Sequence, residues 1–272
     1  KASVKANEYV FAMGGIENSR YLLWFYKKYQ NNFIYNDTSL GRYWMEHPHF
    51  TLGQAIIDNT KVNEKYYSLS AEAQKNLGIL NCGFRVIELN DNALKGLLRE
   101  ILCVAPTIGK SLASLAEKNL ICGVMFRAAW EQAPHYENRI TLDNEKDKFG
   151  IPKPILNWQK KALDRKTIMK SIEVFNQWLL EIDGGRIQLD DWLIKQKNYP
   201  TNDELAGYHH MGGTRMHENP ELGVVDKNCK VYGSDNLYIA GSSVFTTGGH
   251  NNPTLPIVQI ALRLANHLVN KS

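Results

Sequence analysis

The chain has 272 residues, a formal net charge of +4, 43% hydrophobic residues and 22% charged residues. That length suffices for one large or two modest globular domains with a sizeable core. Lysine and arginine alternate with aspartate and glutamate along the whole chain, so the weak positive charge excludes nucleic acid as an expected partner. No stretch reaches the roughly 18 consecutive apolar residues of a membrane span.

The four cysteines lie far apart and form no Cys-x-x-Cys pair: Cys82, Cys103, Cys122 and Cys229. This spacing predicts neither a metal cluster nor a disulfide framework, and we expect reduced, partly buried thiols. The chain opens on a strand-like segment at Lys1 with no secretory signal. We therefore expect a piece of a longer protein, which leaves the compartment open between cytoplasm and periplasm.

The first segment has the pattern of a strand, a tight turn and a helix. Residues 4–12 form a short apolar run, Gly14 and Gly15 break it, and residues 16–28 carry apolar side chains at helical spacing. Such units occur in doubly wound nucleotide-binding folds. A glycine pair before a helix is also typical of an ordinary helix start, so both interpretations stay open here.

The middle of the chain mixes strands with helices of unequal length. The apolar pattern predicts four strands at 50–58, 82–89, 123–132 and 139–142, and two helices at 94–118 and 163–182. Pro106 interrupts the first of these helices, whereas the second has one apolar face. This order indicates an α+β module whose sheet is covered on one face.

The end of the chain returns to an α/β pattern. We expect short strands at 224–226 and 230–232, a buried strand at 236–240, and a helix at 254–269. Gly241 and Ser242 follow the buried strand directly. A strand end close to a helix N-terminus gathers backbone N–H groups near one point, which favours an anionic ligand and above all a phosphate.

Two adjacent histidines, His209 and His210, precede a glycine pair. Imidazole titrates near neutrality, so His209 is suited to take a proton from a hydroxyl group. The alternatives are a surface histidine and a metal ligand. We predict no metal site, because adjacent side chains point in different directions and no cysteine, aspartate or glutamate lies at ligand spacing.

Asn252 stands just before the last predicted helix. An asparagine side chain both donates and accepts hydrogen bonds, which suits it to hold a substrate hydroxyl. The alternative is that Asn251 or Asn252 caps the helix. The spacing alone favours capping.

Six segments, taken in chain order, resemble the glucose–methanol–choline (GMC) oxidoreductase family. The segment His209–Met216 is similar to the family's H-x-x-G-T-x-R-M motif, although Gly213 stands where the family has threonine. The segment Leu40–Pro48 is similar to its G-x-x-x-x-D-H-P motif, with Glu46 in the place of the usual acid. The other four segments are Asn7–Arg20, Glu131–Leu142, Gly223–Phe245 and Asn252–Thr254.

The resemblance implies an FAD-dependent enzyme that oxidises the CH–OH group of an alcohol, sugar or glycoside by hydride transfer to flavin N5. His209 would be the base and Asn252 the second group on the same oxygen, whereas His210 has no implied catalytic role. The asparagine in this place, with the many tyrosines and tryptophans between residues 43 and 208, favours a sugar-like substrate. The implied cofactor contacts are Gly14, Gly15, Gly241, Ser242, Asn252, Pro253 and Thr254.

The implied fold is α/β plus α+β, part of a doubly wound FAD-binding domain joined to a substrate domain with a mixed or antiparallel sheet covered by helices. We expect FAD-domain segments at 1–48 and 196–272 and the substrate domain at 49–195. The family's G-x-G-x-x-G unit is absent from these residues. We therefore expect this FAD-binding half in the same or another chain. The alternatives are a non-catalytic fragment, a subunit of a hetero-oligomeric dehydrogenase and, more remotely, a carbohydrate-binding module.

Overall fold

The computed structural model describes residues 4–29, 38–58, 60–62, 66–88, 120–201 and 207–271. The helix expected at 94–118 lies outside these residues. The chain forms two compact units. The first unit contains Lys1–His47, Gln132–Lys161 and Tyr208–Ser272, and the second contains Pro48–Glu131 and Ala162–Gly207.

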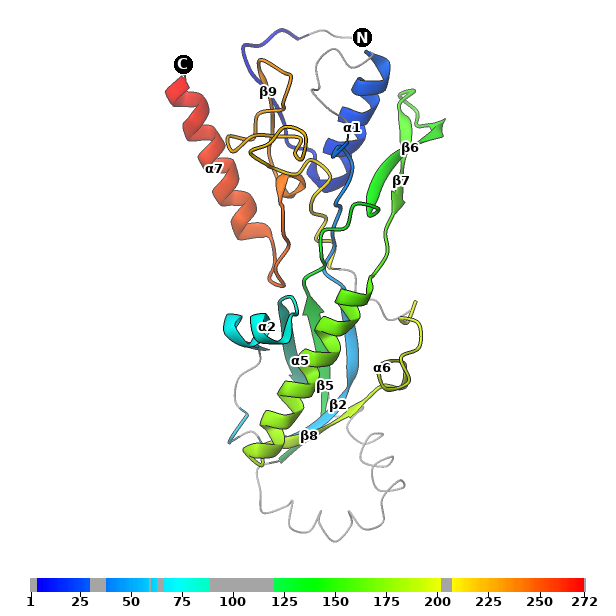
Figure 1. Ribbon diagram of the computed structural model, residues 1–272, viewed down its shortest axis with the longest axis vertical. Coiled ribbons are helices and arrows are strands. Elements are labelled where there is room, and N and C mark those ends of the chain that lie inside the picture. Colours follow the sequence, from blue (N-terminus) through cyan, green and yellow to red (C-terminus); the bar gives the residue numbers. More distant parts are fainter. Residues whose placement is uncertain are drawn as a thin grey trace. The chain divides into compact units, whose positions relative to one another are not determined.

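The first unit is built on two short parallel strands, β1 (Tyr9–Phe11) and β9 (Leu237–Ile239). The helices α1 (Gly14–Lys28) and α7 (Thr254–Lys271) lie on opposite sides of β9 (Figure 1). Both helices contribute to one core, in which Leu22 of α1 and Leu264 of α7 pack with Tyr238 of β9. Parallel strands flanked by helices confirm the α/β arrangement that was predicted for the two ends of the chain.

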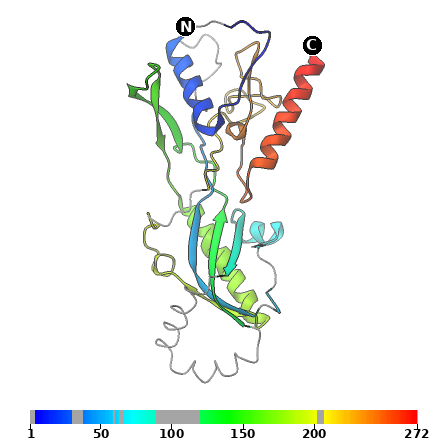
Figure 2. The same ribbon diagram turned by 180° about the vertical axis from the view of Figure 1, so that it is seen from behind.

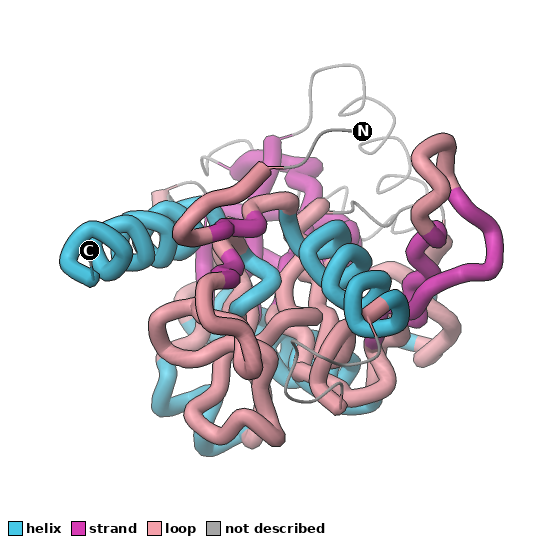
Figure 3. The backbone as a smooth tube through the Cα atoms, turned by 90° about the horizontal axis from the view of Figure 1, so that it is seen from above, coloured by secondary structure: helices cyan, strands magenta, loops and turns pink. Residues whose placement is uncertain are grey.

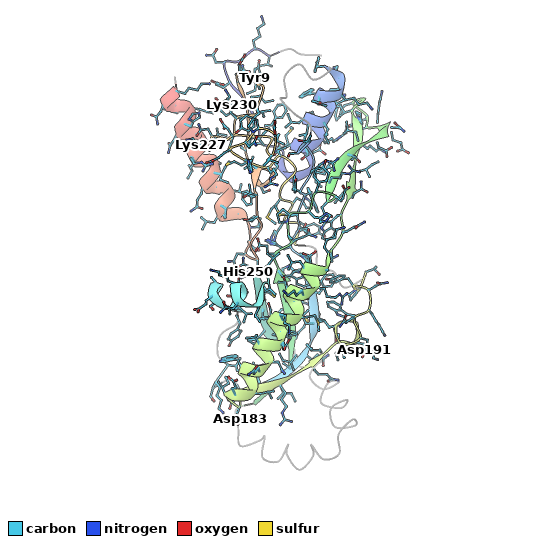
Figure 4. The ribbon with its side chains drawn as sticks, in the orientation of Figure 1. Tyr9, Asp183, Asp191, Lys227, Lys230 and His250 are labelled. Carbon is cyan, nitrogen blue, oxygen red and sulfur yellow. The ribbon has the colours of Figure 1, made fainter. Side chains whose placement is uncertain are left out.

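Much of the rest of the first unit is loop. Figure 3 colours the loops of the described chain pink. The expected strands at 224–226 and 230–232 form isolated bridges instead, between Val225 and Val231 among others. The Asp226 carboxylate accepts the backbone N–H groups of Asn228 and Lys230, at 2.8 and 2.9 Å. This aspartate turn (Lys227 and Lys230 mark it in Figure 4) bends the chain too tightly for regular strands.

A hairpin of β6 (Arg139–Lys146) and β7 (Pro152–Asn157) belongs to the first unit. The sequence placed it in the middle domain at 49–195, so the observed grouping differs from that boundary, and the roles of the three segments stay predictions. The physical reason is Arg20 of α1. Its buried guanidinium donates to Asp147 at 2.7 Å and to the carbonyl groups of Ile151 and Pro152, which joins the hairpin to α1.

The second unit is a five-stranded antiparallel sheet with strand order β3-β4-β5-β2-β8. Its strands are β2 (His49–Asp58), β3 (Tyr66–Ser68), β4 (Cys82–Glu88), β5 (Leu120–Trp130) and β8 (Gly185–Leu189). The helix α5 (Ala162–Glu181) covers one face of this sheet, as the two opposite views agree (Figures 1 and 2). The antiparallel sheet covered by a helix is therefore confirmed.

Four short elements of the second unit were missed from the sequence, because three to seven residues carry little periodic signal. Besides β3 and β8 these are the helices α2 (Ala71–Leu77) and α6 (Asp191–Ile194). Ser70 accepts the N–H group of Ala73, and Gly78 ends α2 in the left-handed conformation. Asp183 after α5 and Asp191 in α6 are labelled in Figure 4.

Several aromatic side chains that the sequence offered as a sugar-binding surface are part of the cores. Trp44, Trp130 and Trp192 are 2%, 0% and 8% exposed. Cys82 and Cys229 are buried free thiols, as expected, and burial raises the pKa of Cys82 to about 12. Among the described helices, none has the length and apolar character that crossing a bilayer requires.

We predict that Phe175→Ala lowers the free energy of unfolding by about 3–5 kcal/mol, because the ring of Phe175 fills the space between α5 and the sheet. It is 5% exposed, and its centroid lies 5.1 Å from that of Phe84 and 5.2 Å from that of Phe126. Denaturant titration of the full-length protein measures the loss. The control is Phe149→Ala, at a ring 74% exposed, and equal losses for the two variants would contradict the packing argument.

Candidate active site

Glu46 joins the two chain segments that carry the histidines of the candidate site. Met45 and Met211 exchange two backbone hydrogen bonds of 2.8 and 3.0 Å, which lays the segments side by side. The adjacent Glu46 carboxylate, buried at 4% exposure, accepts the N–H group of His47 at 3.0 Å and that of His209 at 2.7 Å through the same oxygen. One carboxylate thus fixes the backbone position of both histidines.

A second polar contact holds Glu46 itself. Its backbone N–H donates to the side-chain oxygen of Gln132 at 3.2 Å, and the indole of Trp158 donates to the same oxygen at 2.6 Å. Gln132 in turn donates to the carbonyl of Gln159 at 3.0 Å. Since these groups are largely buried and paired, the backbone at Glu46 has little freedom to move.

His47 lies between His209 and the loop that leads to α7. Its ring is 1% exposed, and its Nδ1 atom lies 2.9 Å from Nδ1 of His209. Its Nε2 atom lies 3.2 Å from the carbonyl oxygen of Gly248. The two rings meet edge to face, with centroids 4.9 Å apart. His250, labelled in Figure 4, belongs to the same loop as Gly248.

The glycine pair after the histidines is required by close packing. Gly212 and Gly213 both have positive φ, of 76° and 91°. A Cβ atom on Gly212 would lie 2.2 Å from the carbonyl oxygen of Tyr43, and one on Gly213 would lie 2.3 Å from Oγ of Ser19. Any larger residue would therefore push the histidine segment away from α1 or from the segment that carries Glu46.

Two of the predicted cofactor contacts, Gly15 and Ser242, act on the backbone of His210. Ser242 Oγ donates to the carbonyl of His210 at 2.6 Å, and a Cβ atom on Gly15 would lie 2.5 Å from the same oxygen. In this structure both residues help to place the histidine segment. A direct contact of either with a cofactor stays a prediction.

The electrostatic surroundings of His209 keep its ring neutral. Burial lowers its pKa below the usual 6.5, and His210 lowers it further, whereas the negative charge of Glu46 acts in the opposite direction. The net shift is downward. At neutral pH the imidazole therefore has a lone pair with which to accept a proton.

Gly14 and Gly241 form an open turn pair at the carboxyl ends of the parallel strands. Their φ angles are 86° and 108°. Apart from the adjacent residues and the backbone of α1 itself, no atom lies within 4 Å of where a Cβ atom would stand on either. Asn18 holds the two turns: its side chain accepts the N–H of Met13 at 3.0 Å and donates to the carbonyl of Ala240 at 3.1 Å. The carboxyl ends of parallel strands are where nucleotide ligands bind in open α/β sheets.

The predicted partner of His209, Asn252, lies in the exposed turn just before α7. Pro253 follows it, buried, and its carbonyl accepts the N–H of Ile257 at 3.0 Å, so Pro253 and Thr254 form the first turn of the helix. Among the described interactions, the Asn252 side chain has no hydrogen bond with His209. The structure connects this loop to His209 through Gly248 and His47 instead.

Glu46, His47 and Gly248 have no role that was predicted from the sequence. Glu46 and His47 stand in the segment Leu40–Pro48, which was noted only for its family pattern. The contact that gives them a role joins residues 162 positions apart. No periodicity or local spacing can reveal such a contact.

The sequence of this chain is similar to those of known proteins. Residues 134–261 match the family model described as GMC oxidoreductase. The chain is 25% identical to the fructose dehydrogenase large subunit of Gluconobacter japonicus, covering 98% of this chain and 48% of that protein. It is 26% identical to 2-methyl-1,2-propanediol dehydrogenase of Mycolicibacterium austroafricanum, covering 97% and 48%.

Solved structures show the same fold. Pyridoxine 4-oxidase from Mesorbium loti superimposes with a TM-score of 0.58 at 14% identity, over 98% of this chain and 52% of that chain. Formate oxidase superimposes with a TM-score of 0.54 at 16% identity, over 96% and 53%. The chain thus spans about half the length of the relatives it matches.

We predict that Glu46→Ala destabilises the protein by roughly 2–4 kcal/mol, because it leaves two backbone N–H groups without their acceptor. Glu46→Gln keeps a side-chain oxygen for the same N–H groups, so we expect a loss of less than half that size. Urea unfolding of the full-length variants measures both. Equal losses for the two substitutions would show that the charge matters, and not the acceptor geometry.

Proposed function

The chain belongs to the GMC oxidoreductase family, and from this premise we propose that the protein oxidises the CH–OH group of an alcohol or a sugar with FAD as cofactor. The observation that carries the proposal is the buried contact between Glu46, His47 and His209. It holds a neutral imidazole in a fixed place, which is what a catalytic base requires.

His209 is the residue to which we assign the substrate proton. Its Nδ1 atom is engaged with His47, so Nε2 is the atom we assign to the hydroxyl group. The ring accepts the hydroxyl proton as the C–H hydrogen leaves as a hydride, and the alcohol becomes a carbonyl compound. The imidazolium formed in this step is stabilised by the nearby Glu46 carboxylate.

We propose that Asn252 hydrogen-bonds the same substrate oxygen and fixes its orientation. An asparagine side chain does not take up a proton at neutral pH, so the base work falls to His209. Its exposed position at the start of α7 supports this assignment, since it leaves the amide accessible.

FAD, when bound, supplies flavin N5 as the hydride acceptor. The open turns at Gly14 and Gly241 fit such a cofactor, because an extended polar group can approach the backbone closely where no Cβ atom stands. We propose these two glycines with Gly15 and Ser242, together with Asn252, Pro253 and Thr254 at the N-terminus of α7, as the part of the FAD site contributed by this chain.

The relatives support a hydroxyl-bearing substrate of small size. One is named for a sugar and one for a branched diol, at nearly the same identity to this chain. The tryptophans between residues 43 and 208 no longer argue for a sugar, because three of them are in the cores. Since the first relative is named a large subunit, a partner chain belongs to the proposal as well.

We predict that His209→Ala slows flavin reduction by roughly 10²- to 10⁴-fold, the usual contribution of a positioned base. Anaerobic stopped-flow bleaching of the flavin in the full-length enzyme measures this, with a panel of monosaccharides and 1,2-diols as substrates. The control is His217→Ala in the same unit, whose ring accepts the N–H of Asn219. Reduction of the His209 variant at the control's rate would sink the assignment.

We also predict the pH dependence of flavin reduction. Since the pKa of His209 lies below 6.5 and the unprotonated ring is the active form, the rate at low substrate concentration is highest at neutral pH and falls as pH drops through that pKa. Stopped-flow measurements from roughly two pH units below the ordinary histidine pKa to about one and a half above it test this. A half-maximal rate reached only above pH 6.5 would contradict the role of burial at His209.

A further inference from the structure

We propose that His47 is a positioning residue that selects the tautomer of His209: it accepts a hydrogen bond from Nδ1 of His209 and so leaves the lone pair on Nε2. The inference deepens the proposed function and rests on it in one respect, namely that the lone pair on Nε2 meets the substrate hydroxyl. The tautomer itself follows from this chain's own contacts.

The carbonyl group of Gly248 determines which nitrogen of His47 holds the proton. A carbonyl oxygen only accepts hydrogen bonds, so the 3.2 Å contact requires a proton on Nε2 of His47. In a neutral imidazole the other nitrogen then has no proton, and Nδ1 of His47 is an acceptor. Its partner at 2.9 Å, Nδ1 of His209, must therefore be the donor.

The opposite tautomer of His209 conflicts with this geometry. If Nε2 of His209 held the proton, two nitrogen lone pairs would face each other across 2.9 Å with no hydrogen between them. The remaining possibility is a protonated His47 that donates to both Gly248 and His209. It requires a positive charge on a ring that is 1% exposed.

The contacts of Glu46 bear on whether His47 is neutral or protonated. One of its oxygens accepts the backbone N–H groups of His47 and His209, and the other lies 3.6 Å from Nε2 of His210. These contacts direct the carboxylate to the backbone and to His210. The burial of His47 and the contact of its Nε2 atom with the Gly248 carbonyl together support the neutral, Nε2-protonated form of this ring.

The consequence is a chain of three groups with one direction of hydrogen bonding, from His209 through His47 to the Gly248 carbonyl. The same logic operates where a carboxylate holds a catalytic histidine in the correct tautomer. When His209 takes up the substrate proton on Nε2, its Nδ1 proton stays in the bond to His47, and no other proton has to move.

The test is the tautomer of His209 in the full-length, FAD-loaded enzyme. Two-bond ¹H–¹⁵N correlation spectra of histidine-labelled protein at alkaline pH distinguish a protonated Nδ1 from a protonated Nε2, and His209→Gln assigns the signal by removing it. We expect the Nδ1-protonated form in the wild type. In His47→Leu, which lacks the acceptor, we expect conversion to the Nε2-protonated form and flavin reduction slowed by about 10-fold or more.

His47→Asn keeps an oxygen near the position of Nδ1, so we expect it to retain the wild-type tautomer and most of the rate. It also keeps the proposal testable should His47→Leu fail to fold. His217→Leu, a change of the same size away from the pair, is expected to remove only its own signals and to alter neither those of His209 nor the rate. A His209 protonated on Nε2 in the wild type, or unchanged in His47→Leu, would overturn the role of His47. Full activity of His209→Ala would instead overturn the proposed function, whatever the spectrum shows.

Discussion

The hydrogen bonds that one oxygen of Glu46 accepts from the backbone of His47 and of His209 are the interaction on which the candidate site depends. They hold together two segments of the chain, since Glu46 and His209 are 163 positions apart. A buried carboxylate is stable only when its oxygens are paired, so the interaction constrains the acid as much as it constrains the histidines. The side chain of aspartate is one methylene group shorter than that of glutamate. The two hydrogen bonds observed here are therefore those of the longer side chain of Glu46.

The same segments are held from the other side by positions that tolerate no side chain. Gly15 and Gly213 bring the histidine segment against α1, and Ser242 ties it to the turn after β9. The parallel strand pair β1–β9 and the histidines are therefore parts of one construction. A cofactor held at the open turns of Gly14 and Gly241 would be bound by the same elements that place His209.

What the sequence predicted well are the long or strongly patterned elements. The helices α1, α5 and α7 and the strands β2, β4 and β5 lie within a few residues of their predicted bounds. The predicted strand pair at 224–226 and 230–232 failed because Asp226 bends the chain into a turn. The grouping of the β6–β7 hairpin, which Arg20 joins to α1, also differs from the predicted boundary at 49–195. Both effects depend on a single polar side chain, which leaves no periodic trace.

The residues of the candidate site also divide into those that the sequence predicted and those that it did not. His209 was identified because two histidines before a glycine pair are unusual in a plain loop, and the structure gives its ring a fixed neighbour and a lowered pKa. His47 appeared in the sequence only as one residue of a family motif. Yet a histidine base needs a second group that decides which nitrogen holds the proton, and a ring wedged between a carbonyl oxygen and another imidazole performs that function. Because hydrogen-bond balance defines this second group, sequence spacing can indicate the base but not the residue that orients it.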